Sequence, residues 1–600
     1  MSGGTDADGL RGRLAALRPS SRSELTDDVV GGLSLVVVLI PQAMAFSALV
    51  GVPPVAGLHA ALLSLLAYAA FGSVPLLSFG PIAIPSLLTG TAVAALAGGD
   101  PGRAVALSGA LAVMVGLTLL LLRVLRASAL VDVISAPVLI GFVSAAGLTI
   151  ATSQLRALLG ITAAGSDRFL EAFMNVLGAV GSTHALTAAI GVASVVALLV
   201  GRRIAPRLPT VLVLAAVAIP ASVLLDLGGR GVALVGEVPS GLPLPRLPDV
   251  DVAGLRALAG SAVAIAVVGF TQTVALAKAI AARQRRSIGA DREFVAAGTA
   301  NLLAGLFGGF PTGGSLSMSA VLESSRARTR NSLFWTGGFL AVVLLLLTAV
   351  LEPLPRTILA ALIITAALRF VDVAGFRTVL RVSRADAAVA LATFLGTLAL
   401  GVLNGLAIGI GANLVVHLSR RMRPGVVELG RVVGTTEYRN VASYPTVGSA
   451  DGVLLRLDGA LDFLNAGAVG TAVRRVAAER DGLRWILLDA SGVSELDATG
   501  LRTLEDLTVN LADAGIDLHL AHLRAPQRAT VERAGLHARL IADRCHPSIP
   551  EGLRALGVAP ADPVLGVTTT AWIDWTSLDD VTGYERTGAG CPNVTAPNDY

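Results

Sequence analysis

The chain has 600 residues, of which 54% are hydrophobic and 15% are charged, and its formal net charge is +4. Soluble domains contain fewer apolar and more charged residues, so this composition excludes an ordinary soluble globular protein. The basic residues are spread over many short segments, which excludes the single basic patch of a nucleic-acid-binding protein.

The first 25 residues are polar and charged, and repeated apolar stretches follow between residues 29 and 418. Each stretch has about 17 to 25 residues, the length at which a helix crosses about 30 Å of hydrocarbon. The pattern predicts an N-terminal cytoplasmic segment over residues 1–25 and a membrane domain over residues 26–423 with about fourteen spans.

Basic residues occur in alternate loops between these spans. Because arginine and lysine are enriched in cytoplasmic loops, this distribution predicts a multi-pass protein of the plasma (inner) membrane with both chain ends in the cytoplasm. The basic loops contain Arg18 and Arg22, Arg123 and Arg126, Arg202 and Arg203, Arg285 and Arg286, Arg328 and Arg330, Arg381 and Arg384, and Arg420 and Arg421.

The third apolar stretch is interrupted by residues that end helices. In FGSVPLLSFGPIAIPS, from Phe71 to Ser86, Gly80 and Pro81 stop any helix that reaches them. A similar interruption occurs in FGGFPTGGSLSMSAV, from Phe307 to Val321. Both segments begin Phe-Gly-x-x-Pro, so we expect a short extended piece followed by a helix that begins inside the membrane.

The positions of these interruptions indicate an internal repeat. Gln42 in IPQAMAF precedes the first interruption, and Gln272 in FTQTVAL precedes the second by a similar interval. The two repeats cover about residues 26–228 and 252–420. Because seven spans precede the second copy, the copies enter the membrane from opposite sides, as in inverted-repeat transporters.

Irregular backbone at membrane depth is stable where it lines a cavity. Two helices that begin there point amide groups with partial positive charge into the same space, and such a pair can hold an anion. The hydroxyls of Thr312, Ser315, Ser317 and Ser319 can add neutral hydrogen bonds. Close helix packing explains either segment alone, but the matched pair favours a substrate site.

The composition changes near residue 424. Short strand patterns at Gly452–Gly459, Leu483–Ser491 and Asp517–Leu523 alternate with helical ones, which predicts a cytoplasmic α/β domain over residues 440–556. Residues 557–600 lack periodicity, and we expect a mobile tail there.

Together these motifs resemble those of the SulP family of anion permeases, the sulfate permease type with a C-terminal STAS domain. The resemblance covers roughly residues 26–556. It rests on IPQAMAF, on GVPPVAGLHAALL, on SFGPIA, on NLLAGLFGGFP, on GGSLSMSAV and on LDATG.

The resemblance implies a fold of core and gate domains, in which the core carries the anion by elevator-type movement, and usually a homodimer. It also implies an anion held between the third and tenth spans. Transferred position by position, the implied substrate-binding residues are Gln42, Phe79, Gly80, Pro81, Ile82, Gln272, Ser315, Leu316, Ser317 and Met318.

In the cytoplasmic domain, the resemblance implies a regulatory loop. Asp497 would cap the following helix, and Thr499 matches a hydroxyl that is phosphorylated in some regulatory relatives. A simple capping turn is the alternative. A cytoplasmic protein partner of the STAS domain is a further hypothesis.

Two departures from the family's residues affect the charge of the expected anion site. Many relatives have an arginine where this chain has Met318, and Gln272 replaces an acid that often lies in the eighth span. A sodium site is therefore not expected. No cofactor and no other metal site is expected either. Coupling to H+ stays open, although no acid is expected well inside the core spans and His59 is the nearest titratable candidate.

We therefore expect a secondary active transporter of a small inorganic anion embedded in membrane lipid, and no enzyme. Sulfate is the first expectation, and bicarbonate, chloride, nitrate or a dicarboxylate are the alternatives. A non-transporting membrane sensor or scaffold that displays its STAS domain is the alternative of another class.

Overall fold

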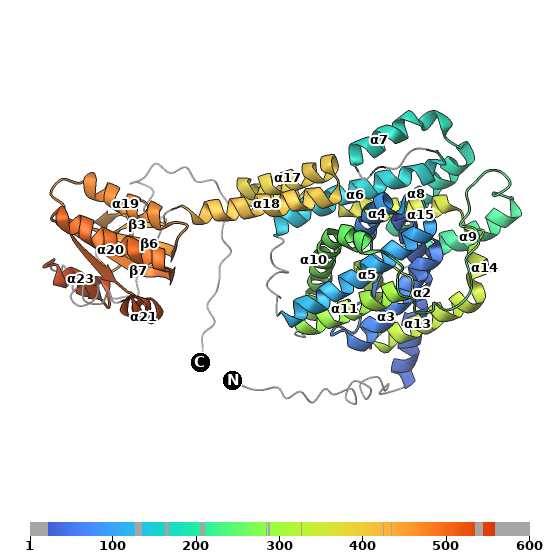
Figure 1. The fold of residues 1–600 in the computed structure, drawn as a ribbon, viewed down its shortest axis with the longest axis horizontal. Coiled ribbons are helices and arrows are strands. Elements are labelled where there is room, and N and C mark those ends of the chain that lie inside the picture. Colours follow the sequence, from blue (N-terminus) through green and yellow to red (C-terminus); the bar gives the residue numbers. More distant parts are fainter. Residues whose placement is uncertain are drawn as a thin grey trace. The chain divides into compact units, whose positions relative to one another are not determined.

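The structure of the protein is a computed structural model, and the chain divides into two compact units, Met1–Val416 and His417–Tyr600 (Figure 1). We describe each unit separately. The described residues are 22–125, 135–162, 166, 168–204, 210–283, 285, 289–325, 327–423, 425–433, 435–534 and 544–558. The expected N-terminal segment up to residue 21 and the expected tail from residue 559 lie outside them.

In the described part of the first unit, the regular elements are helices and two very short strands, joined by turns and loops. Its first half contains α2 (Arg22–Val50), α3 (Pro54–Phe71), β1 (Phe79–Gly80), α4 (Ala83–Ala97), α5 (Pro101–Val124), α6 (Ala136–Leu159), α7 (Phe169–Gly178), η2 (Val180–Ser182), α8 (Ala185–Ile204) and α9 (Thr210–Leu224). Its second half contains α10 (Val252–Arg283), α11 (Ala290–Leu306), β2 (Gly313–Gly314), α12 (Leu316–Ser324), α13 (Asn331–Val342), η3 (Val343–Leu347), α14 (Thr348–Leu351), α15 (Arg356–Ala367), η4 (Leu368–Phe370), α16 (Val373–Val382), α17 (Arg384–Leu400) and α18 (Val402–Arg421).

The order of elements in the first half recurs in the second. Each half begins with two helices, a two-residue strand and a short helix, and α7 and α16 occupy equivalent later places. The strands β1 and β2 pair antiparallel, which agrees with insertion of the two halves from opposite sides. The predicted polytopic helical fold is therefore confirmed, and the described elements repeat as the sequence indicated.

Eight described helices are long and apolar enough to cross a membrane. They fall short of the expected fourteen or so spans, because other segments are shorter. α4 has 15 residues and α12 has 9, since both begin at the predicted interruptions. These two are the half-length helices on which the expected site depends.

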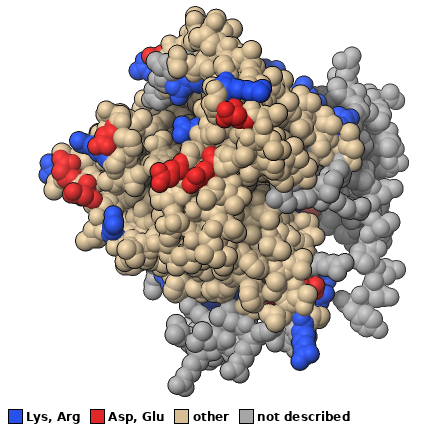
Figure 2. All heavy atoms as spheres, turned by 90° about the vertical axis from the view of Figure 1, so that its right-hand side faces the viewer, with Lys and Arg blue, Asp and Glu red and all other residues tan. Residues whose placement is uncertain are grey.

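The outer surface of the first unit suits lipid. On α5, Leu117, Leu121 and Val124 are 53%, 56% and 75% exposed, and their spacing places them along one helix face. Figure 2 shows a face on which uncharged residues cover most of the described surface and charged residues form separate small groups.

Glycines bring α5 and α11 into close contact. A Cβ atom on Gly116 would lie 2.7 Å from the carbonyl oxygen of Gly298, and one on Gly305 would overlap the carbonyl of Gly109. Each helix therefore carries two glycines seven residues apart at the crossing, which is the small-residue packing typical of membrane helices.

We expect Gly116→Val to destabilise the protein by about 1 to 3 kcal/mol, because the helices must separate to admit the side chain. The measurement is the midpoint of thermal unfolding in detergent. Gly260→Val, in α10, is the control, since a Cβ atom there meets no described atom within 4 Å. Equal midpoints for the two variants would contradict close packing at the crossing.

The second unit contains a mixed sheet with the order β4-β3-β6-β7-β8-β9, and β5 also pairs with β3. Strands β6 to β9 are parallel, as expected from alternating strands and helices, whereas β3 is antiparallel to β6. Its elements are β3 (Val426–Val432), β4 (Tyr438–Asn440), β5 (Thr446–Val447), β6 (Gly452–Leu461), α19 (Ala466–Ala478), β7 (Trp485–Leu496), α20 (Ala498–Asp513), β8 (Asp517–Ala521), α21 (Ala525–Arg533), β9 (Cys545–His546) and α23 (Ile549–Ala555).

The LDATG loop leads into α20. The Asp497 carboxylate accepts hydrogen bonds from the backbone N–H of Gly500 at 2.7 Å and of Phe463 at 2.9 Å. Asp497 is therefore the N-cap of α20, as predicted, and Thr499 is exposed in the first turn.

Candidate functional site

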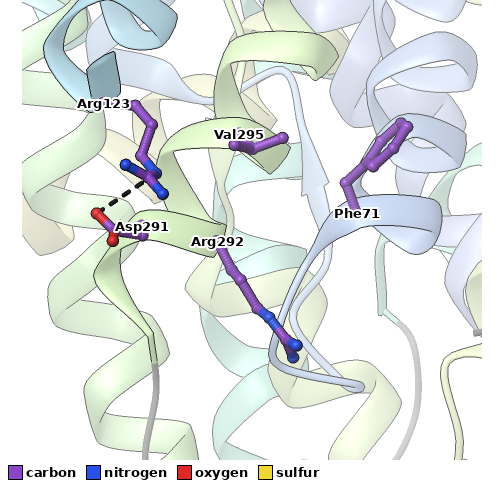
Figure 3. A pocket seen from close by; sticks show the side chains of 5 residues that line it. All are labelled: Phe71, Arg123, Asp291, Arg292 and Val295. Carbon is purple, nitrogen blue, oxygen red and sulfur yellow. Dashed lines mark ion pairs between the residues drawn. The ribbon is translucent and has the colours of Figure 1, made fainter. Parts of the chain in front are cut away.

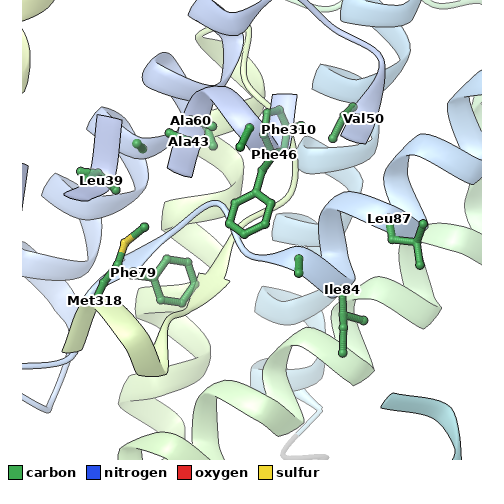
Figure 4. Packing of buried hydrophobic residues seen from close by; sticks show 14 of the residues in the cluster. Leu39, Ala43, Phe46, Val50, Ala60, Phe79, Ile84, Leu87, Phe310 and Met318 are labelled. Carbon is green, nitrogen blue, oxygen red and sulfur yellow. The ribbon is translucent and has the colours of Figure 1, made fainter. Parts of the chain in front are cut away.

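The two interrupted segments meet at a short antiparallel pair of strands. Phe79 pairs with Gly314 and Gly80 with Gly313, and the backbone N–H of Ser315 donates to the carbonyl oxygen of Ser78 at 2.9 Å. Because α4 and α12 begin just after these strands, the pairing brings the two helix N-termini together, as the sequence predicted (Figure 4).

The residues predicted from the third span are all buried, and one of them, Gly80, leaves room for a small side chain. Phe79 is 1% exposed and Ile82 is 9% exposed. A Cβ atom on Gly80 would meet only the Cδ1 atom of Leu39, at 3.8 Å, among the described atoms. Pro81 has no N–H, so it ends the strand without leaving an unsatisfied donor.

The residues predicted from the tenth span divide into two groups. Ser315 is the N-cap of α12, and its Oγ lies 3.4 Å from the backbone N of Met318 and 3.3 Å from the Oγ of Ser317. Leu316 and Ser317 are exposed, whereas Met318 is fully buried with its Sδ atom 3.8 Å from the Oγ of Ser78. Ser317 therefore contributes the accessible side-chain hydroxyl of this turn.

Two of the other expected hydroxyls have different surroundings. The Oγ of Ser319 accepts a hydrogen bond from the backbone N–H of Ser78 at 2.9 Å, so it joins the two segments. The Oγ1 of Thr312 is buried and has no partner among the described residues. The Ser319 hydroxyl thus supports the site's architecture, a role that the sequence did not indicate.

The two predicted glutamines lie on the helices that begin each half. Gln42, in α2, is 8% exposed, and Gln272, in α10, is half-buried. Neither has a hydrogen-bond partner among the described residues, so both amide groups can bind a ligand.

Two residues that hold the second interrupted segment were missed from the sequence. The Oγ1 of Thr273, in α10, accepts from the N–H of Gly314 at 3.0 Å. The Oδ1 of Asn301, in α11, accepts from the N–H of Thr312 at 2.8 Å, and its Nδ2 donates to the carbonyl of the same residue at 3.2 Å. A polar side chain within an apolar span was the signal that could have found both.

A buried acid was also missed. Glu293 has no exposed surface, although it lies in the first turn of α11 and so at the end of a helix and not well inside a span. Asp28, in the second turn of α2, is likewise fully buried. Both lie near helix ends, where an acid in the sequence suggests a solvated position, and only tertiary packing shows that they are buried. His59 is half-buried, without a hydrogen-bond partner among the described residues.

A pocket of about 200 Å³ lies where α3 and α5 end and α11 begins (Figure 3). Its lining residues are Phe71, Arg123, Asp291, Arg292 and Val295. The Nε atom of Arg123 lies 3.4 Å from the Oδ1 atom of Asp291, so an acid offsets part of the positive charge. None of the predicted substrate-binding residues lines this pocket.

The model of the sulfate permease family matches residues 25–393, and the model of the STAS domain matches residues 441–551. The probable sulfate transporter of Mycobacterium tuberculosis is 33% identical over 544 residues, covering 90% of this chain and 97% of its own. The chloroplastic sulfate transporter 4.1 of Arabidopsis thaliana is 29% identical over 527 residues, covering 85% and 77%.

Solved structures confirm the fold class. The murine Solute Carrier 26 family member A9 anion transporter, in the inward-facing state, has a TM-score of 0.85 at 22% identity and covers 93% of this chain and 96% of its own. The transmembrane domain of the cyanobacterial bicarbonate transporter BicA has a TM-score of 0.57 at 24% identity, covering 65% and 98%. Given the family model and the M. tuberculosis relative, the chain belongs to the sulfate permease family, a family of anion transporters, and it carries a C-terminal STAS domain.

Proposed function

We propose that the protein is a secondary active transporter of sulfate or another small anion, bound between the N-termini of α4 and α12. The observation that carries this proposal is the pairing of β1 with β2, which brings the two helix starts together. The family supports anion transport, and the names of the curated relatives support sulfate. Bicarbonate, chloride, nitrate and dicarboxylates remain alternative substrates.

The proposed ligand contacts are neutral. They comprise the first-turn amides of α4 and α12, the hydroxyl of Ser317 and the amides of Gln42 and Gln272. Met318 is buried and uncharged, so it adds no positive charge. A helix terminus contributes about 0.3 to 2 kcal/mol toward an anion, and complete dehydration of a dianion costs many times more. Bound sulfate would therefore keep water or arrive with a proton.

We propose that transport can be coupled to H+, and no sodium site is proposed. Gln272 supplies no carboxylate, and Leu276, one helical turn further along α10, is buried and apolar.

We also propose elevator-type movement of a core against a gate, a homodimer in the plasma membrane and cytoplasmic chain ends. The exposed Thr499 is proposed as a phosphorylation site, which mass spectrometry of natively expressed protein tests.

Uptake into proteoliposomes tests the function. We expect labelled sulfate to accumulate against its gradient when an inward proton gradient is imposed, with little effect of sodium. Accumulation of another anion instead would replace sulfate as the substrate. If no anion in the panel of sulfate, bicarbonate, chloride, nitrate and dicarboxylates moves under any gradient, the non-transporting scaffold would be favoured.

A further inference from the structure

The buried carboxylate of Glu293 ties α11 to the segment that leads into β1. It accepts a hydrogen bond from the hydroxyl of Tyr68 at 2.9 Å and one from the backbone N–H of Ser73 at 3.0 Å. The hydroxyl of Ser73 donates to the same carboxylate. A buried charge is costly without such partners, so these three donors account for the stable burial of Glu293.

The first turn of α11 therefore has an exposed side, at the pocket that Figure 3 shows, and a buried side. Asp291 and Arg292 are exposed at the surface pocket, whereas Glu293 is buried. A charged residue at a helix end that interacted only with water or lipid headgroups would be exposed, as Asp291 and Arg292 are. The position of Glu293 indicates a role inside the unit.

Tyr68 links Glu293 to the proposed anion site. Its ring stacks on the ring of Phe79, with centroids 5.1 Å apart and an interplanar angle of 7°. A Cβ atom on Gly72 would lie 2.6 Å from the Cε1 atom of Tyr68, so the backbone there packs tightly against the ring. The Nη2 atom of Arg330 donates to the carbonyl oxygen of Gly72 at 2.8 Å and fixes this backbone.

Phe79 is the residue through which Tyr68 can affect the ligand. It forms β1 with Gly80, and Figure 4 shows its ring near Met318, at the start of α12. A change in the position of Phe79 moves the β1–β2 pair and hence the two helix N-termini. Because the field of a helix terminus falls off within its first turn, small displacements there weaken anion binding.

We infer that Glu293 and Tyr68 are positioning residues for the anion site: Glu293 orients the Tyr68 ring, and the Tyr68 ring holds β1. This inference rests on the proposed function, since it takes β1 to border the bound anion. Neither residue contacts the anion itself.

The test compares the KM and maximal rate of anion uptake by the full-length protein in proteoliposomes. We expect Tyr68→Leu and Glu293→Leu each to raise KM about tenfold. The first variant removes the ring that stacks on Phe79, and the second removes the hydrogen bond that orients this ring. Glu293→Gln retains one acceptor for Ser73 and one donor for Tyr68, so we expect its KM to stay within about threefold of the unmodified protein. A purely structural role would lower the amount of folded protein and the maximal rate and would leave KM unchanged.

Asp28 provides the matched control. It is as buried as Glu293 and accepts hydrogen bonds from the backbone N–H groups of Arg328 and Thr329 at 2.9 and 3.0 Å, and from the Thr329 hydroxyl. These contacts include neither Tyr68 nor a residue of β1, so Asp28→Leu is expected to lower thermal stability and to raise KM much less than Glu293→Leu. An equal rise in KM for Asp28→Leu would overturn the inference, as would an unchanged KM for both Tyr68→Leu and Glu293→Leu.

A direct variant of the site separates this inference from the proposed function. If Gly80→Phe impairs uptake while Tyr68→Leu and Glu293→Leu leave KM unchanged, the site stands and the positioning role is wrong. If Gly80→Phe has no effect, the proposed site itself is wrong, and any change in KM at Tyr68 would need another cause.

Discussion

Gly80→Phe is expected to reduce anion uptake by at least about 100-fold, which corresponds to about 2.7 kcal/mol. Gly80 lies between Phe79 and the start of α4, and a Cβ atom there would meet only the Cδ1 atom of Leu39, at 3.8 Å, among the described atoms. A phenyl group is much larger than a Cβ atom, and next to the two helix starts it would exclude the anion from the proposed site. Uptake of labelled anion into proteoliposomes measures the loss, and the elution profile of the purified protein reports its folding.

Gly80→Ala is the control for this experiment. Its methyl group makes ordinary contact with Leu39, and the φ angle of Gly80 does not require glycine. We expect Gly80→Ala to keep uptake within about threefold of the unmodified protein. If Gly80→Phe transports normally, or if both variants lose uptake equally, the space beside β1 is not the anion site.

Ser317→Arg is expected to change which anion the protein prefers. Ser317 is exposed in the first turn of α12, so a long side chain fits there, whereas an arginine at the buried Met318 would not. A positive charge about 6 Å from the ligand contributes about 3 kcal/mol per anion charge at an effective dielectric constant of about 20. A dianion gains twice as much as a monoanion.

Solvent at this exposed position screens part of the effect, so we expect the preference for sulfate over chloride to rise by about tenfold. Competition of unlabelled chloride with labelled sulfate measures the preference. Ser317→Met is the neutral control of comparable length, and it should leave the preference unchanged. The same shift in both variants would show that size and not charge is responsible, and no shift in either would place Ser317 away from the anion.

The features predicted correctly from the sequence are those that neighbouring residues determine. Gly80, Pro81 and the glycines before Ser315 end helices by local backbone chemistry, so the starts of α4 and α12 follow from the sequence. The α/β pattern after residue 440 likewise shows in short strand and helix periods. That the two helix starts face each other was predicted from the matched positions of the interruptions, whereas the antiparallel pairing of β1 with β2 was not predicted.

Contacts between distant residues were not predicted. The hydrogen bond from Gly314, in β2, to Thr273, in α10, spans 41 residues of sequence, and the one from Tyr68, in α3, to Glu293, in α11, spans 225. Periodicity carries no information about which polar side chains meet across such distances. The strand β3, antiparallel to β6, was missed because its pairing depends on the sheet and not on its own pattern.

The β1–β2 pair also constrains how the protein is assembled during synthesis. Its two strands come from opposite halves of the membrane unit, so β1 has no partner until the ribosome has made the second half. Until then, the backbone polar groups of the Phe79–Gly80 segment must find water or a temporary partner, since hydrocarbon offers none. The first half is therefore expected to remain incompletely embedded when produced alone, and to complete its insertion when the second half is supplied as a separate chain.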